Sequence, residues 1–576
     1  VVSVKDFGAV GDGVADDTAA IQAAVTFTRL QGGQSRKLYW PRGTYLITNQ
    51  ITLGTNQSIE FDPGVTINLV PVAATPEFTS LFVASNQSEI YLNGNGAVLN
   101  GTRTGAVAEG NAAALFIYGC DNVTISNFII NDFATDGITL TGDSTGSGPC
   151  RNVLIQNCYV NNCRRNGMSI ISAVGCVVIG GEYRGSNGAP AGPWAGIDIE
   201  PNTDCFLEDV TLIGVNTASN VGAGIQITPG ALASTTGKRF HVNIIGGRSF
   251  NDGATATVSG LYFANGGGIT NKIYGQVIVR GFSVDQPKSA GVNFREWDAD
   301  KCPRVLLEDV TVFNPDSTLS AASNFDRTGF VIYADSTQTT NNLGNIELRN
   351  CLAEDLRGTA RMTWGMRAEA DTGKVIKNVL VVDPVAINTV ASAKYDINTS
   401  VAGGVGSSSG FDVTYTTPKF VDVAGTQNIA SYGGKRINAT ASSTLTLPSA
   451  SACKGLAYEI QAAPGVDSVT VAVQTGDIIS GTIGVASTNI VLDAGGYIKL
   501  RSQGGTTWTV EYISGRWRRA GTSRAKSIQW ATAAPTSGTW TAGDKIINET
   551  PAVGQPKGWV CTVGGTPGTW VSEGNL

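Results

Sequence analysis

The segment "CRNVLIQNCYV" at residues 150–160 decides the fold, because two other segments share its register down to the leading cysteine. They are "CDNVTISNFII" at 120–130 and "CPRVLLEDVTV" at 302–312. Apolar and polar residues alternate along all three, which is typical of short β-strands with one buried face. Recurrence of the same strand pair along the chain predicts a repeat architecture.

A glycine that leads a third short strand follows the paired strands in each repeat. It recurs at spacings of 28 to 38 residues, at Gly137, Gly167, Gly196, Gly224, Gly260, Gly291 and Gly329. A unit of that size cannot bury its apolar side alone, whereas stacked units bury it between successive turns. The repeat therefore predicts an all-β parallel β-helix. A β-sandwich, built from antiparallel hairpins with turns every roughly 8–12 residues, fits a three-strand repeat less well.

The segment "ADDTAAIQAAVTFTRL" at 15–30 predicts a short amphipathic helix with Asp17 at its N-cap. Such a helix would cap the open end of the solenoid. The repeat pattern stops near residue 398, where a Gly/Ser-rich stretch follows. We expect an N-terminal cap at 1–50, the β-helix at 51–398, a linker at 399–418, a β-rich trimerisation or carbohydrate-binding module at 419–515 and a small β module at 516–576.

The composition excludes several classes of partner. The net charge of −6 and the pI near 5.1 disfavour nucleic acid and an anionic membrane. No apolar run reaches the roughly 18 residues that span a bilayer, so no membrane is expected. The ten cysteines form no CxxC pair and His241 is the single histidine, which argues against a zinc site. We expect buried free thiols and neither a metal nor another cofactor.

Two ladders of side chains share one outer face if Ile197 and Ile199 point into the core. The first reads Thr139, Ser169, Asp198, Gln226, Tyr262 and Asn293; the second reads Thr141, Ile171, Glu200, Thr228, Ala264 and Arg295. Asp198 and Glu200 are their only acidic members. Their Cβ atoms should be roughly 6.5–7 Å apart, which allows the carboxyl separations of about 5 to 9.5 Å found in glycosidases. Mutual repulsion should raise one pKa and produce an acid beside an ionised carboxylate.

Further candidate residues surround this pair. Asp136 immediately precedes Gly137 and is expected either to assist catalysis or to cap a turn. The candidate substrate-binding residues are Arg164, Arg165 and Arg295 for an acidic sugar, Trp194 and Tyr262 for stacking on sugar rings, and Gln226 and Asn293 on the same face. The structural alternatives are that Asp198 and Glu200 are solvated outward charges and that Trp194 packs a loop.

Two terminal motifs resemble known families. "VVSVKDFGAVGDGVADDTAAIQAAV" at 1–25, followed by "LYWPRGTYLI" at 38–47, resembles the N-terminal signature of the pectate-lyase-like right-handed β-helix family. "GWVCTVGGTPGTWVSEG" at 558–574 resembles the C-terminal end of bacteriophage tailspikes. The resemblance implies a homotrimeric tailspike on the phage virion, made in the cytoplasm of the host bacterium, that cleaves bacterial capsular or O-antigen polysaccharide. It also implies attachment to the phage tail or an adaptor protein through an N-terminal segment missing from this sequence.

Three functions follow as hypotheses. The first is an endo-acting glycoside hydrolase that uses Asp198 and Glu200. The strand motif Gly196-Ile197-Asp198 also resembles polygalacturonase-type glycosidases. The other acidic residues and the histidine of those enzymes have no match here. The second is a polysaccharide lyase, in which Tyr262 or an arginine is the base and Arg165 or Arg295 neutralises a uronate. The third is a non-catalytic glycan-binding adhesin. A site formed between two subunits of a trimer is compatible with each.

Overall fold

The structure is a computed structural model, and it is built almost wholly of β-strands. Among the described residues, the helices are α1 (Thr18–Thr28) and the short 3-10 helices η1 (Val4–Phe7), η3 (Gly230–Ser234) and η5 (Ala450–Cys453). The structure describes residues 1–576 apart from 30–35, 72–78, 104–111, 144–147, 189–191, 204, 235–236, 254–258, 266–269, 316–326, 335–341, 360, 372, 388–396, 399–408, 415–419, 431–435, 454, 482–485, 516 and 520–527.

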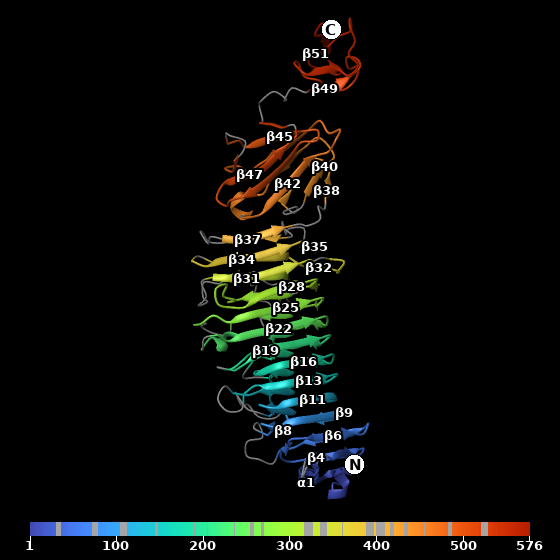
Figure 1. The fold of residues 1–576 in the computed structure, drawn as a ribbon, viewed down its shortest axis with the longest axis vertical. Coiled ribbons are helices and arrows are strands. Elements are labelled where there is room, and N and C mark those ends of the chain that lie inside the picture. The colour runs from blue at the N-terminus through green and yellow to red at the C-terminus, as the bar shows by residue number, and fades with distance from the viewer. Residues whose placement is uncertain are drawn as a thin grey trace. The chain divides into compact units, whose positions relative to one another are not determined.

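Residues 1–417 form one compact unit in which successive coils stack in parallel (Figure 1). Each coil contributes a strand to one sheet, and a glycine lies at the start of each strand from β12 to β33. The sheet holds β5 (Ile51–Thr52), β8 (Phe82–Ser85), β10 (Leu115–Tyr118), β12 (Ile138–Thr141), β15 (Met168–Ile170), β18 (Ile197–Ile199), β21 (Ile225–Ile227), β24 (Leu261–Phe263), β27 (Val292–Arg295), β30 (Thr328–Ala334), β33 (Trp364–Ala370) and β36 (Ile397–Asn398). Below, this is called the glycine-led sheet.

The other strands of the coils form a larger bent sheet, called the long sheet below. One row of it contains β1 (Val2–Ser3), β3 (Lys37–Trp40), β6 (Gln57–Phe61), β9 (Ser88–Asn100), β11 (Asp121–Asn131), β13 (Cys150–Gln156), β16 (Ala173–Ile179), β19 (Leu207–Ile213), β22 (Arg239–Ile245), β25 (Tyr274–Arg280), β28 (Arg304–Glu308), β31 (Asn342–Arg349), β34 (Val375–Val382) and β37 (Ser409–Thr414). The other row contains β2 (Asp12–Asp16), β4 (Gly43–Ile47), β7 (Val65–Leu69), β14 (Tyr159–Asn161), β17 (Glu182–Arg184), β20 (Asn216–Ala218), β23 (Arg248–Phe250), β26 (Ser283–Asp285), β29 (Thr311–Phe313), β32 (Leu352–Glu354) and β35 (Val385–Ile387). The prediction of an all-β chain with long parallel sheets is confirmed, and this pairing is that of a parallel β-helix.

The repeating glycine has a steric cause in the stacking of the coils. A Cβ on Gly137 would lie 2.6 Å from the carbonyl oxygen of Gly167, and one on Gly167 would lie 2.6 Å from that of Gly196. The same contact, at 2.7 Å, joins Gly196 to the carbonyl oxygen of Gly224. Since real Cβ atoms do not approach carbonyl oxygens so closely, these coils need a residue without a side chain where they enter the glycine-led sheet.

Apolar side chains of all strand rows fill the interior of the coils. Ile197 and Ile199 point inward and are fully buried, and Phe263 stacks on Phe294 of the next coil with ring centroids 4.5 Å apart. The ten cysteines are free and buried, which confirms the expectation of unpaired thiols. No helix among the described residues is long and apolar enough to cross a membrane.

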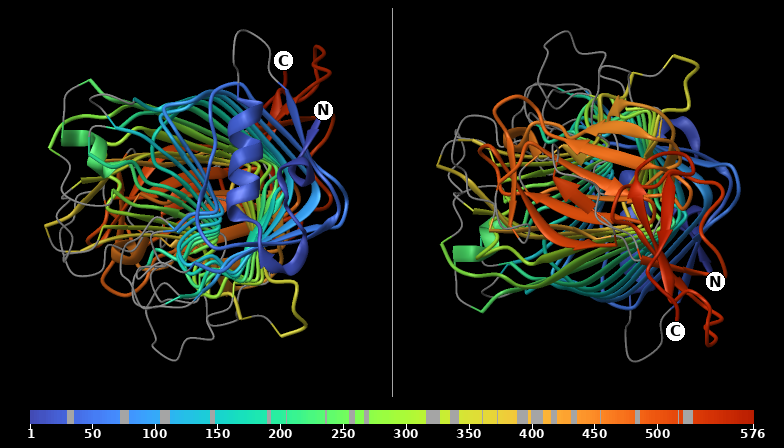
Figure 2. Two further views of the ribbon diagram at one scale, coloured as in Figure 1. Left: turned by 90° about the horizontal axis from the view of Figure 1, so that it is seen from below. Right: turned by 90° about the horizontal axis from the view of Figure 1, so that it is seen from above.

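Helix α1 lies across the N-terminal end of the coils (Figure 2, left). Its residues Ile21 and Val25 are fully buried in the same core as the first strands, as their spacing predicts. Asp17 occupies the N-cap position, but its carboxylate makes no capping bond; it accepts hydrogen bonds from the backbone nitrogens of Val10 and Gly11 at 2.6 and 3.0 Å. The helix and its N-cap residue are found where expected, and its role as a cap of the solenoid stays a prediction.

The β-helix continues beyond the predicted boundary at residue 398. Strand β37 lies inside the predicted linker 399–418 and pairs in parallel with β34, so that part of the linker assignment is wrong. The rest of that stretch lies outside the described residues. The Gly/Ser-rich run at 401–410 overlaps the start of this strand, whose six residues are too few to be recognised as a further repeat from the sequence alone.

Residues 418–576 form a second compact unit. One sheet holds β38 (Phe420–Val423), β40 (Arg436–Ala439), β42 (Ala457–Ala462), β46 (Tyr497–Ser502), β47 (Thr507–Ser514) and β44 (Ile478–Gly481), and another holds β39 (Gln427–Asn428), β41 (Ser443–Thr446), β43 (Ser468–Ala472), β45 (Asn489–Asp493) and β48 (Trp517–Arg519). A small sheet holds β49 (Ile528–Ala531), β50 (Lys545–Asn548), β51 (Gly558–Val563) and β52 (Thr569–Ser572). Because β48 pairs with β45, residues 517–519 belong with the strands before residue 515 rather than with the last module.

Candidate active site

The outer face of the glycine-led sheet carries the first predicted ladder in the predicted register. Asp198 of β18 lies beside Ser169 of β15 on one side and Gln226 of β21 on the other. The pairing continues from Ser169 back to Thr139, and from Gln226 through Tyr262 to Asn293. Although Asp198 points away from the core, only 6% of it is exposed. The alternative that it is a solvated surface charge is therefore wrong.

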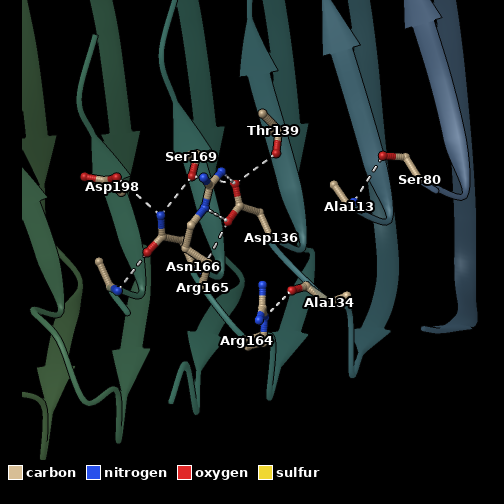
Figure 3. Close-up of polar contacts among 11 residues, drawn as sticks. Ser80, Ala113, Ala134, Asp136, Thr139, Arg164, Arg165, Asn166, Ser169 and Asp198 are labelled. Carbon is tan, nitrogen blue, oxygen red and sulfur yellow. Dashed lines mark hydrogen bonds and ion pairs between the residues drawn. The ribbon is translucent and has the colours of Figure 1, made fainter. Parts of the chain in front are cut away.

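Asp136 and Arg165 form a buried ion pair one to two strands from Asp198 (Figure 3). The Nε and Nη2 atoms of Arg165 donate to the two oxygens of the Asp136 carboxylate at 2.8 and 2.7 Å. Ser169 Oγ and Thr139 Oγ1 donate to the same carboxylate at 2.8 and 3.1 Å, and the backbone nitrogen of Asn166 donates at 3.2 Å. Although burial opposes the charge, Arg165 and these donors hold the pKa of Asp136 below its usual value. Asp136 is thus an ionised carboxylate whose acceptor positions are engaged.

Asn166 connects this cluster to Asp198 and was not singled out from the sequence. Its Nδ2 donates to Ser169 Oγ at 3.0 Å and to Asp198 Oδ2 at 3.3 Å, while its Oδ1 accepts from the backbone nitrogen of Ala195 at 2.9 Å (Figure 3). Asn166 precedes Gly167 as Asp136 precedes Gly137. The position before each repeat glycine could therefore have predicted Asn166 as a site residue, but only Asp136 was predicted from it.

The electrostatics of Asp198 and Glu200 favour protonated forms. Burial is the largest cause that raises the pKa of Asp198 well above its usual value, and the neighbouring Glu200 adds to it. Burial also raises the pKa of Glu200, against the opposing effect of the charge of Arg165. The predicted rise is thus present, but desolvation rather than mutual repulsion is its main cause. The Oδ1 atom of Asp198 has no hydrogen-bond partner among the described residues.

Two predicted sugar-binding residues are engaged elsewhere. Arg164 is buried, and its Nε donates to the carbonyl oxygen of Ala134 at 2.7 Å, away from the Asp198 carboxyl (Figure 3). The Trp194 indole N–H donates to the carbonyl of Gly188, and its backbone has a φ of 57°. Left-handed backbone is uncommon for a large residue, so the chain holds Trp194 in a defined turn just before β18.

The remaining candidates lie along the same face. Gln226 and Asn293 are almost fully buried, and Tyr262 between them is half-buried, with burial raising its pKa. Arg295 follows at the end of β27 and pairs in register with Tyr333 of β30. The structure thus brings Asp136, Arg165, Asn166, Ser169, Asp198, Glu200 and Gln226 together and places Arg295 further along the sheet.

Comparison with known proteins gives a family match at the N-terminus. Residues 1–63 match a family described as rhamnogalacturonase A/epimerase, pectate lyase-like. An uncharacterized protein of Bacillus subtilis, YclG, is 25% identical over 415 residues, which cover 62% of this chain and 66% of that protein. The plasmin and fibronectin-binding protein A of Streptococcus pneumoniae is 31% identical over 175 residues, which cover 27% of this chain and 23% of that protein. The chain therefore spans just under two thirds of the first relative and about a quarter of the second.

Among solved structures, the catalytic unit of a GH87 alpha-1,3-glucanase from Streptomyces thermodiastaticus has 16% identity and a TM-score of 0.48. The match covers 72% of this chain and 67% of that one. We draw no functional conclusion from that likeness.

Proposed function

We propose that this protein is an endo-acting glycoside hydrolase that cleaves a bacterial capsular or O-antigen polysaccharide as a homotrimeric phage tailspike. The observation that carries the proposal is the environment of Asp198: a nearly buried carboxyl on the outer face of a β-sheet, beside a second carboxyl, with one oxygen held by Asn166. A buried acid beside a second carboxyl is the arrangement that glycoside hydrolysis requires.

Asp198 is the general acid in this proposal. Burial raises its pKa well above the usual value, and Asn166 Nδ2, which can only donate, faces Oδ2. In the proposed reaction the proton is therefore carried on Oδ1, which is buried and has no partner among the described residues, and passes to the glycosidic oxygen. The leaving sugar takes that proton as the glycosidic bond breaks.

Glu200 is the second carboxylate. Burial raises its pKa, though less strongly than that of Asp198, and the charge of Arg165 favours its ionised form. It either takes a proton from the attacking water or attacks the anomeric carbon itself; the anomeric configuration of the first product distinguishes the two. Arg165 and Asp136 are positioning residues that hold the coil carrying Asn166.

The test is depolymerisation of purified capsular and O-antigen polysaccharides, measured as new reducing ends. We expect Asp198→Asn and Glu200→Gln each to lower kcat/KM about 10²–10⁴-fold, the usual contribution of a general acid or base. Asp209→Asn is the matched control, because Asp209 is an exposed carboxylate on the long sheet that pairs with His241 at 2.8 Å. Activity retained in both site variants would show that other residues perform the reaction.

A glycan-binding adhesin is the second candidate, favoured by the 31% identity over 175 residues to a plasmin and fibronectin-binding protein. It predicts that a polysaccharide binds and stays intact. The lyase hypothesis predicts products with the ultraviolet absorbance of an unsaturated uronate, whereas hydrolysis produces reducing ends without it.

A further inference from the structure

The immediate surroundings of Asp198 and Glu200 contain one cation, and Asp136 already engages it. The two hydrogen bonds between Arg165 and Asp136 make that pair electrically neutral. Within the described part of the chain, no ion pair joins a lysine or arginine to Asp198 or Glu200. Among the described residues, Asp198 and Glu200 therefore have no paired cation, although the charge of Arg165 lowers the pKa of both.

The other cations of the neighbouring coils are directed elsewhere. Arg164 donates to the carbonyl oxygen of Ala134, and Lys238 donates to that of Cys205 at 3.1 Å while lying over the ring of Phe206. Arg103 donates to the side-chain oxygens of Asn162 and Asn187. The remaining lysines and arginines between residues 101 and 264 belong to strands of the long sheet: Arg151, Arg184, Arg239 and Arg248. The undescribed residues of this span include no lysine or arginine.

Along the glycine-led sheet, the next cation lies beyond electrostatic reach. Arg295 is on β27, three strands from β18, so it is about 14 Å away at roughly 4.8 Å per strand. Opposite charges that far apart at a wet surface are largely screened at physiological salt, where the Debye length is about 8 Å. The ladder positions between them are uncharged: Gln226, Thr228, Tyr262, Ala264 and Asn293.

We propose that the sugar units joined by the scissile bond are neutral, carrying hydroxyl or amide groups but no carboxylate. This inference rests on the proposed hydrolase function and names its substrate class. A uronate here would place a third acidic group beside the buried Asp198 and the partly buried Glu200, without a free cation nearby, at a large desolvation cost. The side-chain amide of Gln226, beside Asp198 in register, can instead pair with sugar hydroxyls. Arg165 is then a structural partner of Asp136 and not a uronate-binding residue.

The experiment uses the full chain with a panel of capsular and O-antigen polysaccharides, both neutral and uronate-containing. New reducing ends identify the polysaccharide that is cleaved. Tandem mass spectrometry of the oligosaccharide products then identifies the sugars on both sides of the broken bond. The Asp198→Asn variant and the Asp209→Asn control are assayed on the same polysaccharide, so that cleavage is assigned to this centre.

We expect neutral sugars at both new ends, with cleavage lost in Asp198→Asn and kept in Asp209→Asn. A uronate at either end, with the same dependence on Asp198, overturns the inference and leaves the hydrolase function intact. Unsaturated uronate products, or no new reducing ends from any member of the panel, contradict the proposed function, and the inference fails with it.

Discussion

At the scale of single residues, the site depends on how burial acts on carboxyl groups that point away from the core. Asp198 faces outward from the coil but is almost fully covered, so its neutral form is favoured. Asp136 is equally buried, yet the bidentate contact with Arg165 keeps it ionised. Neighbouring coils thus place on the same face one carboxyl whose pKa is raised and one whose pKa is lowered.

The first prediction concerns pH and Arg165. The charge of Arg165 lowers the pKa of both Asp198 and Glu200, so Arg165→Gln should move both limbs of the bell-shaped kcat/KM profile to higher pH. Arg165→Lys keeps the charge and should keep the limbs near their wild-type positions. Profiles that coincide in all three proteins would contradict the electrostatic role.

Removal of Arg165 should also destabilise the fold. It leaves the fully buried Asp136 carboxylate without its cation, which typically costs about 3–5 kcal/mol. The double variant Asp136→Asn with Arg165→Gln leaves no unpaired charge and should lose less stability than Arg165→Gln alone. Urea unfolding measures the free energy of unfolding of the single and the double variant. A double variant less stable than Arg165→Gln would contradict this account.

A second buried carboxyl predicts a pH-dependent stability. Asp252 accepts hydrogen bonds from Thr217, Ser249 and Asn220 at 2.7 to 2.9 Å, yet burial raises its pKa from 3.8 to about 6. Because the folded pKa is the higher one, the stabilisation is complete below about pH 4 and is lost as the pH rises through 6. That shift corresponds to about 3 kcal/mol.

Comparison with Asp252→Asn isolates this contribution. The stability of the wild type relative to the variant, measured by urea unfolding, should fall between about pH 4 and pH 7 by an amount of that order. A difference that stays constant across this range would show that Asp252 does not titrate there.

At the scale of elements, the repeat glycines are steric requirements of the stack. A Cβ on Gly291 would lie 2.7 Å from the carbonyl oxygen of Gly329 and would collide with Val312. Gly291→Ala should therefore cost about 1–3 kcal/mol, the usual penalty of overpacking. Gly358→Ala is the control, because a Cβ there meets no atom within 4 Å. Equal unfolding free energies for the two variants would contradict the steric explanation.

The sequence predicts strands and register well, because the period of two in "GIDI" and its copies decides which face each side chain occupies. It does not predict hydrogen-bond partners across coils. Arg165 was expected to bind substrate but binds Asp136, and Asn166 was missed, because both contacts join residues about thirty positions apart. Strand β37 was missed because its six residues are too few to be recognised as a further repeat.

At the scale of the whole molecule, the homotrimer stays a prediction. The outer face of the long sheet carries Ile213 and Ile245, neighbours in register on adjacent strands that are 37% and 45% exposed. Sedimentation equilibrium should give a mass of three times 59.8 kDa, and a monomer at micromolar concentration would contradict the trimer.

The most direct measurement of the central claim is the release of reducing ends from the cognate polysaccharide by the wild type, Asp198→Asn and Asp209→Asn. The account predicts that Asp209→Asn matches the wild type, while Asp198→Asn loses about 10²–10⁴-fold in kcat/KM and keeps the wild-type thermal midpoint or exceeds it. A fully active Asp198→Asn would contradict the assignment of this buried carboxyl as the catalytic acid.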